Sequence, residues 1–185
     1  LLGDDLLVAP VVERGARQRT LPLPPGRWRH WFTGEVYEGP AEITVDAPLN
    51  ELPLFQRAGS AIPMLRPTID TLAPTVTSTS ESYANDPGAL WLRVEPGEGG
   101  FEVFDGTSVN VRSDGIDAVA GERFERFVAW YPFVSDRPLV TVDGAAPRVV
   151  AESAEFITDG PESLVYYSEN GMQVYLPNGS QTLQL

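Results

Sequence analysis

Glycine and proline interrupt this chain along its whole length, and no other feature limits its fold as strongly. The 185 residues include 17 Gly and 17 Pro, and both residue types break helices or mark turns. Three dipeptides between apolar runs, Asp143-Gly144, Asn170-Gly171 and Asn178-Gly179, suit type I′ hairpin turns. Regularly spaced short strands and turns predict an all-β protein of antiparallel β-sandwiches, because parallel units would need helical crossovers.

Alternating or continuous apolar residues predict the individual strands. In the first third they cover residues 6–12, 20–23, 27–32, 36–37, 42–46, 52–57 and 61–65. Residues 6–12 are apolar on both faces, as in a central strand covered on both sides. Pro10 lacks a backbone donor and argues for an edge, a bulge or a strand end at that point.

A change of composition predicts a domain boundary. Residues 66–86 are rich in Ser, Thr and Pro and poor in large apolar side chains, as linkers are. We therefore expect two consecutive domains, residues 1–66 and residues 67–185. In the second, the expected strands cover residues 75–79, 90–95, 100–104, 108–113, 123–130, 139–142, 148–151, 163–168, 172–176 and 182–185.

Charge and composition exclude several classes of partner. The net charge is −13, and such an acidic chain repels the phosphate backbone, so nucleic acid is not an expected partner. The clustered Arg14, Arg17, Arg19, Arg27 and Arg29 are interpreted as exposed strand-face charges. No apolar stretch approaches the ~20 residues that span a bilayer, so a membrane is not expected either. There is no cysteine, which leaves the cellular location open.

Few residues suggest catalysis or metal binding. Asp4 and Asp5 could be a carboxylate pair, but capping of the following strand is the favoured interpretation. His30 is the only histidine, and we interpret it as structural. The carboxylates of Asp105, Asp114 and Asp117 leave a single loop site for calcium open, although their spacing does not fit an EF-hand. We expect no catalytic residue, no cofactor and no metal.

Aromatic residues are the remaining candidates for a binding function. Trp28, Trp31, Trp91 and the pair Tyr166-Tyr167 could stack on the apolar faces of sugar rings. Alternatively they fill sandwich cores, which we favour, since Trp28 and Phe32 fall on one strand face, as do Trp130, Val128 and Phe124. Which of them contacts carbohydrate is unknown from the sequence.

Several separated segments, in order, resemble one enzyme family. They are residues 3–11, the stretch Leu23 to Gly26 with Trp28 and Trp31, residues 33–39 and residues 45–64. Together they are similar to the segment that follows the catalytic barrel in glycoside hydrolase family 31, the α-glucosidase and α-xylosidase family. Residues 90–97 and 100–108 resemble the family's distal domain, but an acidic loop common there is contracted to Phe104-Asp105-Gly106.

The resemblance implies a proximal and then a distal C-terminal β-sandwich, the proximal one lacking its first strand or strands. It implies that the parent polypeptide hydrolyses α-glycosidic bonds and that these sandwiches buttress its catalytic barrel, the expected partner. The family's nucleophile lies in a W-x-D-M-N-E segment of the barrel, and no such string occurs here. This chain alone is therefore expected to be inactive, and we expect further sequence upstream of it.

Two other functions stay open. One is a free-standing carbohydrate-binding module, a role that β-sandwiches often serve, although fold alone does not establish it. The other is a structural domain that associates with itself through apolar surface.

Overall fold

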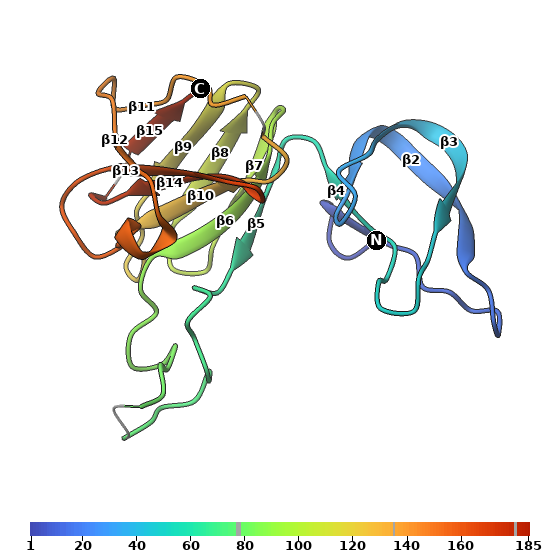
Figure 1. Cartoon of the computed structure of the whole chain (residues 1–185), viewed down its shortest axis with the longest axis horizontal. Helices are drawn as coiled ribbons and strands as arrows, with labels where there is room; N and C mark the ends of the chain where they lie inside the picture. Colours follow the sequence, from blue (N-terminus) through green and yellow to red (C-terminus); the bar gives the residue numbers. More distant parts are fainter. Residues whose placement is uncertain (77–78, 135, 180) are drawn as a thin grey trace.

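The computed structural model describes residues 1–76, 79–134, 136–179 and 181–185, and this part of the chain is built almost wholly of β-strands. The strands form a four-stranded sheet followed by a sandwich of a six-stranded and a five-stranded sheet (Figure 1). One 3₁₀ turn, η1 (Ser153–Glu155), is the helical element of the described residues. The predicted all-β class is confirmed, and most of the strand pairs are antiparallel, as predicted. None of the described helical segments could cross a membrane.

The first sheet, called here the N-terminal sheet, has the order β1-β4-β2-β3 and is antiparallel throughout. Its strands are β1 (Leu6–Val8), β2 (Gln18–His30), β3 (Val36–Asp46) and β4 (Leu54–Arg57). The long β2–β3 hairpin is strongly curled (Figure 1). Its register shifts between Leu23 and Gly26, where a bulge strengthens the local twist, and the sheet covers a small core. Trp28 and Phe55 are at the centre of that core.

The strand expected over residues 6–12 is shorter and lies elsewhere in the sheet than predicted. β1 ends at Val8, just before Pro10, and pairs only with β4. It is thus an edge strand rather than a central one. The prediction gave more weight to the apolar residues on both faces than to Pro10, which cannot donate to a sheet ladder.

The second unit, called the C-terminal sandwich, encloses the largest core between two sheets. The six-stranded sheet has the order β12-β13-β14-β10-β6-β5, and the five-stranded sheet β11-β15-β9-β8-β7. The strands are β5 (Ser60–Met64), β6 (Leu90–Glu95), β7 (Gly99–Glu102), β8 (Ser108–Arg112), β9 (Gly115–Val119), β10 (Phe127–Tyr131), β11 (Thr141–Val142), β12 (Arg148–Val150), β13 (Leu164–Ser168), β14 (Gly171–Leu176) and β15 (Gln181–Gln184).

Two neighbouring strand pairs in the six-stranded sheet are parallel, which the sequence did not lead us to expect. They are β6 with β10 and β12 with β13. The chain between β6 and β10 passes through β7, β8 and β9 of the opposite sheet. A crossover can therefore run through the second layer of a sandwich and needs no helix.

Strand β5 pairs with β6 along its whole length, from Ser60 opposite Glu95 to Met64 opposite Trp91. It therefore belongs to the C-terminal sandwich, although it precedes the expected boundary at residue 66. The segment that joins it to β4 consists of Ala58 and Gly59 alone. The division into residues 1–66 and 67–185 stays a prediction, and the strand pairing favours a division at this two-residue link.

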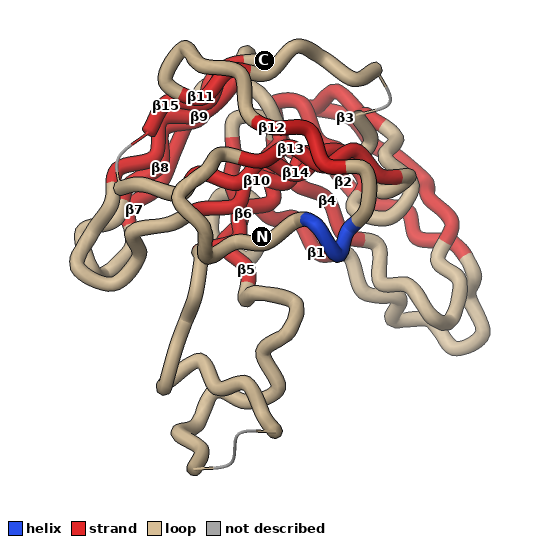
Figure 2. Tube along the Cα trace, turned by 60° about the vertical axis from the view of Figure 1, so that its left-hand side comes forward, coloured by secondary structure: helices blue, strands red, loops and turns tan. Residues whose placement is uncertain are grey.

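Residues 65–76 and 79–89 form an arm that leaves the sandwich between β5 and β6 (Figure 2). The strand expected over residues 75–79 falls partly on residues outside the described part of the chain. Strand β9, in contrast, was not predicted, because Asp114 and Asp117 were taken to mark an acidic loop. Ile116 and Ala118 are fully buried on its inner face, while Asp117 lies on the outer face and pairs with Arg112.

The hairpin turn predicted at Asp143-Gly144 is confirmed. Both residues have positive φ, 50° and 78°, and Val142 and Ala145 exchange two backbone hydrogen bonds around them. Asp143 is one of only two non-glycine residues with positive φ given for the described chain; the other is Phe133, at 66°.

Candidate functional site

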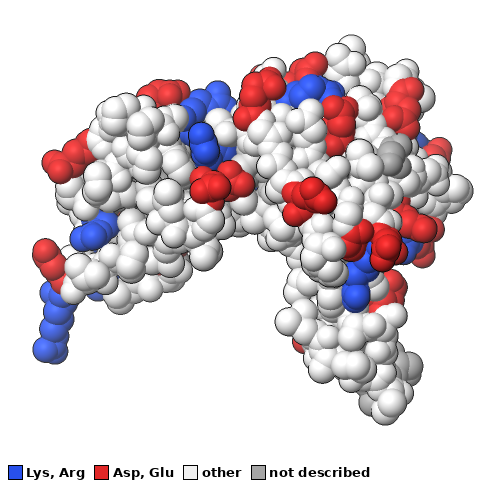
Figure 3. Space-filling view, turned by 180° about the vertical axis from the view of Figure 1, so that it is seen from behind, with Lys and Arg blue, Asp and Glu red and all other residues white. Residues whose placement is uncertain are grey.

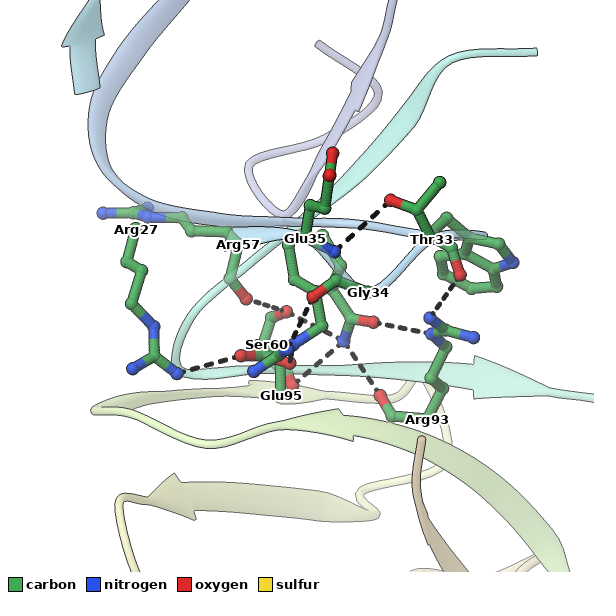
Figure 4. Close-up of polar contacts among 11 residues, drawn as sticks. Arg27, Thr33, Gly34, Glu35, Arg57, Ser60, Arg93 and Glu95 are labelled. Carbon is green, nitrogen blue, oxygen red and sulfur yellow. Dashed lines mark hydrogen bonds and ion pairs between the residues drawn. The ribbon is translucent and has the colours of Figure 1, made fainter. Parts of the chain in front are cut away.

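The N-terminal sheet meets the C-terminal sandwich at a cluster of mostly polar residues, called here the joint: Arg27, Arg29, Trp31, Gly34, Gln56, Ser60, Arg93, Glu95 and Phe133. Four of them, Gln56, Ser60, Arg93 and Glu95, are buried. The joint forms on the outer face of β6, because Leu92 and Val94 point into the sandwich core and side chains alternate along a strand. Arg93 and Glu95 therefore point away from that core and toward the N-terminal sheet (Figure 4).

Arg93 is the central group of the joint and is only 3% exposed. Its Nε donates to Gln56 Oε1 at 3.0 Å, and its Nη2 donates to the Trp31 carbonyl at 2.9 Å. The guanidinium lies 3.7 Å from the Trp31 ring centroid and 5.0 Å from that of Trp130, which provides cation–π attraction. Burial lowers its pKa to about 10, against the effect of Glu95, so Arg93 stays charged at neutral pH.

Glu95 is as buried as Arg93 and forms ion pairs with two arginines of the N-terminal sheet. Arg27 Nη2 lies 2.9 Å from Glu95 Oε1, and Arg29 Nε lies 2.6 Å from Oε2. Arg29 also donates to the Gly34 carbonyl at 2.9 Å. Both oxygens of this carboxylate are thus paired with cations, which a buried charge requires.

Gln56 links the β4 end of the joint to β5 and β6. Its Nε2 donates to the Arg93 carbonyl at 3.0 Å and to Ser60 Oγ at 3.1 Å. Ser60 Oγ in turn donates to the Arg57 carbonyl at 2.6 Å. Because Gln56 is 2% exposed, each of these bonds satisfies a group that water does not reach.

Phe133 supplies the apolar contact of the joint. A Cβ placed on Gly34 would come within 2.7 Å of the Phe133 ring, so this ring packs directly on the Gly34 backbone. Phe133 adopts φ of 66°, a conformation that is costly for a bulky residue. Packing against the N-terminal sheet and the nearby Arg29 and Arg93 guanidinium groups accounts for this conformation.

The joint consists of paired charges, satisfied amides and stacked rings. A buried ion pair contributes little net stability but is costly to break, because its partner is left unpaired. Such a set of directional contacts suits a mechanical role. It fixes the orientation of the N-terminal sheet on the sandwich.

His30 is buried, 4% exposed, in accord with a structural role. Its Nδ1 accepts from the backbone amides of Phe32 and Thr33, and its ring meets Phe55 edge-on. Burial lowers its pKa, against the opposing effect of Glu35 and Glu51. Neutral His30 therefore holds the turn that leads to Gly34.

The candidate carboxylates are dispersed. Asp4 and Asp5 lie in the turn before β1, and burial raises the pKa of Asp5. Asp105 accepts hydrogen bonds from the Thr107, Arg123 and Phe124 backbone amides; burial would raise its pKa, but these bonds and that of the Thr107 hydroxyl lower it.

Asp114 and Asp117 both pair with Arg112 instead. Within the described ranges, no three His, Cys, Asp or Glu side chains are grouped to hold a metal ion.

The candidate aromatic residues occupy different environments. Trp28 is 2% exposed, and its Nε1 donates to the Pro24 carbonyl at 3.1 Å, whereas Phe32, expected beside it, is exposed. Trp31 is in the joint, and Trp91 packs against a smaller core outside the sandwich. Tyr166 and Tyr167 both line a surface cavity.

Sequence reasoning missed Arg93, Glu95, Gln56 and Phe133. The alternation in residues 90–95 could have shown that Arg93 and Glu95 share one face of β6, but it does not indicate what that face contacts. Trp31, which accepts from Arg93, and Arg29, which donates to Glu95, both lie more than sixty residues earlier in the sequence. No local pattern signals such a contact.

The fold and the joint define a class: an all-β module whose consecutive sheets are locked together by a polar joint. A family model described as "Glycosyl hydrolase family 31 C-terminal domain" matches residues 1–62. Residues 1–62 thus resemble the C-terminal domain of glycosyl hydrolase family 31.

Relatives of known name agree with this assignment. Sulfoquinovosidase of Escherichia coli (strain K12) is 52% identical over 60 residues, which are 32% of this chain and 9% of the relative. The α-glucosidase of Mucor javanicus is 29% identical over 121 residues, 61% of this chain and 13% of the relative. The chain therefore spans only a small fraction of the curated relatives it matches.

A solved structure extends the similarity to the second unit. The cycloalternan-forming enzyme from Listeria monocytogenes in complex with pentasaccharide substrate matches with a TM-score of 0.75 and 26% identity. The match covers 99% of this chain and 18% of that one. The N-terminal sheet and the C-terminal sandwich thus have counterparts together, in this arrangement, within that larger polypeptide.

Proposed function

We propose that this chain is the non-catalytic C-terminal support of a larger glycosidase that cleaves α-glycosidic bonds, and that it braces the catalytic barrel of that polypeptide. The observation that carries the proposal is the match of 99% of this chain to 18% of the cycloalternan-forming enzyme, together with the family match of residues 1–62. The joint supports it as well. A brace transmits orientation only if its parts are fixed to one another, and Arg93 and Glu95 fix them.

One end of the N-terminal sheet has the character of a docking surface. Val12 and Leu49 are 72% and 86% exposed there, and the loops that carry them enclose a cavity of about 540 Å³. Glu13, Arg17 and Glu51 surround it. Exposed apolar residues with a polar rim are typical of interfaces, and we assign this end to the contact with the barrel.

Charge is distributed in accord with a protein partner rather than a nucleic acid. On the face shown in Figure 3, acidic residues alternate with a few arginines, and no broad basic surface is visible. The same view shows a hollow between the N-terminal sheet and the arm between β5 and β6. This hollow would allow a convex partner to contact both units.

The extent of the parent reading frame tests the proposal directly. We expect several hundred codons upstream that include a barrel with the family's nucleophile segment. The 185-residue chain alone should not hydrolyse aryl α-glycosides. Turnover by the chain, abolished by changing a single carboxylate, would contradict the proposal.

The docking surface can be tested in the longer protein expressed from that frame. Leu49→Asp should lower the thermal stability of the catalytic domain, because it places a charge in an apolar contact. Leu139→Asp is the matched control, since Leu139 is 93% exposed on the C-terminal sandwich. Equal effects of the two substitutions would remove Leu49 from the barrel contact.

Self-association is the second candidate, because the same apolar residues are exposed and could equally meet a second copy of this chain. Light scattering on the isolated 185 residues distinguishes the two. A concentration-dependent dimer that Leu49→Asp dissociates would favour self-association. A free-standing carbohydrate-binding module remains a further candidate, and its binding is tested separately below.

A further inference from the structure

A cavity of about 790 Å³ opens at the surface of the C-terminal sandwich and shares no lining residue with the cavity of the docking surface. It lies between the β13–β14 hairpin and the segment after β10, and its lining includes Phe133, Arg137, Tyr166, Tyr167, Glu169 and Asn170. This volume is within the range of sites that hold small organic ligands. Of its lining, only Phe133 also belongs to the joint, and the proposed support role uses none of the other lining residues.

The aromatic walls of the cavity are held in place from outside it. Tyr166 packs against Phe156 with ring centroids 6.3 Å apart. Phe133 is 43% exposed, and its ring packs on Gly34 in the joint. The Tyr167 hydroxyl donates to the Pro138 carbonyl at 2.8 Å. Rings fixed in this way lose little conformational entropy when a ligand stacks on them.

The hairpin that closes the cavity is also pre-organised. Trp130 Nε1 donates to the Asn170 carbonyl at 3.0 Å, and Ser168 Oγ accepts from the Asn170 amide at 3.1 Å. These bonds fix the backbone of the turn. The side-chain amide of Asn170 and the Glu169 carboxylate lie at this exposed turn. Arg137 adds a guanidinium 5.6 Å from the Tyr167 ring centroid.

We propose that this cavity binds a short neutral oligosaccharide. The apolar faces of sugar rings suit the Phe133 and Tyr166 rings, and hydroxyl groups can donate to Glu169 and accept from Arg137 and Asn170. One cation and one anion in the lining leave it without a strong preference for a charged ligand. The chain's net charge of −13 further disfavours an anionic sugar.

Calorimetry on the full 185-residue chain, with maltotriose and isomaltotriose as probes, tests this proposal. We expect weak, saturable binding of at least one of the two. Tyr166→Leu keeps an apolar contact with Phe156 but removes the stacking ring, and should weaken binding about tenfold or more. Arg137→Ala, at an exposed position, should weaken it without affecting the melting temperature.

Tyr83 provides the matched control. Arg123 lies 4.7 Å from the Tyr83 ring centroid, as Arg137 lies over Tyr167. Tyr83, however, lines a different cavity. Tyr83→Leu and Arg123→Ala should leave the affinity unchanged. Glucose 6-phosphate serves as the anionic probe and should not compete.

Three results would overturn the proposal. They are absence of binding by either trisaccharide, binding that the control substitutions weaken as much as the cavity substitutions, and preference for the phosphorylated sugar. The measurement needs no catalytic domain, so its result is independent of the support role.

Discussion

The Arg93 guanidinium stacks 3.7 Å from the centroid of the Trp31 ring and donates to the carbonyl of the same residue. Trp31 follows β2 in the N-terminal sheet, and Arg93 lies on β6 in the C-terminal sandwich. One side chain thus makes an ion–ring contact and a hydrogen bond across the joint. The covalent connection between the N-terminal sheet and the C-terminal sandwich is the two-residue link of Ala58 and Gly59.

Removing the charge of Glu95 should weaken the joint. In Glu95→Gln, Arg27 and Arg29 lose their carboxylate, and we expect a loss of about 2–4 kcal/mol in the free energy of unfolding. Arg27 is 41% exposed, so water compensates part of the loss. Denaturant unfolding followed by tryptophan fluorescence measures the change.

Glu102→Gln is the control for that substitution, because Glu102 is exposed on β7. It should change stability by less than about 0.5 kcal/mol. Similar effects of the two substitutions would show that Glu95 has no special role at the joint. A separate early transition in Glu95→Gln alone would show the N-terminal sheet unfolding first.

Gly34→Ala should destabilise the chain more than a glycine substitution at an open turn. Gly34 has φ of 77°, and an added Cβ would meet the Phe133 ring at 2.7 Å. Gly106 has a similar φ of 84° with nothing within 4 Å of the added atom. Gly106→Ala should therefore cost about 1 kcal/mol from backbone strain, and Gly34→Ala about 1–3 kcal/mol more from overpacking.

Thermal melts of both glycine variants measure that difference. The substitution Phe133→Gly removes the ring, so in the double variant with Gly34→Ala the excess cost should disappear. Equal melting temperatures for Gly34→Ala and Gly106→Ala would contradict the packing of Phe133 on the N-terminal sheet.

Trp28→Ala should cost about 3–5 kcal/mol, the range for removing a large buried aromatic side chain. Trp28 is 2% exposed in the core of the N-terminal sheet, and its Nε1 bond to Pro24 would be lost too. Denaturant melting measures the change. A cost below 1 kcal/mol would place Trp28 at the surface and make it a candidate for sugar binding again.

Acidification should destabilise the turn that His30 holds. Because burial lowers its pKa in the folded state, the unfolded chain binds a proton more readily. The stability that neutral His30 contributes is complete above its ordinary pKa and is lost as pH falls through the lower, folded-state value.

The stability difference between about pH 7.5 and pH 5 should therefore shrink in His30→Asn. Since His30 is the only histidine, NMR titration of its imidazole reports the folded-state pKa without overlap. A pKa at or above the ordinary value would contradict the prediction.

Local patterns predicted most of the strands. Residues 90–95 alternate so strongly that β6 has the expected bounds, and Asp143-Gly144 forms the expected turn because both residues tolerate positive φ. The position of β1 in its sheet was predicted wrongly, since residues apolar on both faces can belong to an edge strand. Strand β9 was missed because outward-facing Asp117 resembles a loop residue.

The failure to predict the joint has a different cause. Nothing in the sequence near Arg93 distinguishes a guanidinium that meets solvent from one that stacks on Trp31, because the partner is contributed by another sheet. The pairing of β5 with β6 was likewise hidden by the long arm between them. Contacts between sheets depend on how the connections place one sheet against another. Strand periodicity indicates only which residues share a face of one strand.

Cutting the polypeptide after residue 62, where the family match ends, would divide β5 between Ile62 and Pro63. The remaining sandwich would then present an unpaired stretch of β6, and bare strand edges recruit neighbouring molecules. Anyone separating the two units for study should therefore open the chain at Ala58, so that the outermost strand stays with the sheet it protects from aggregation.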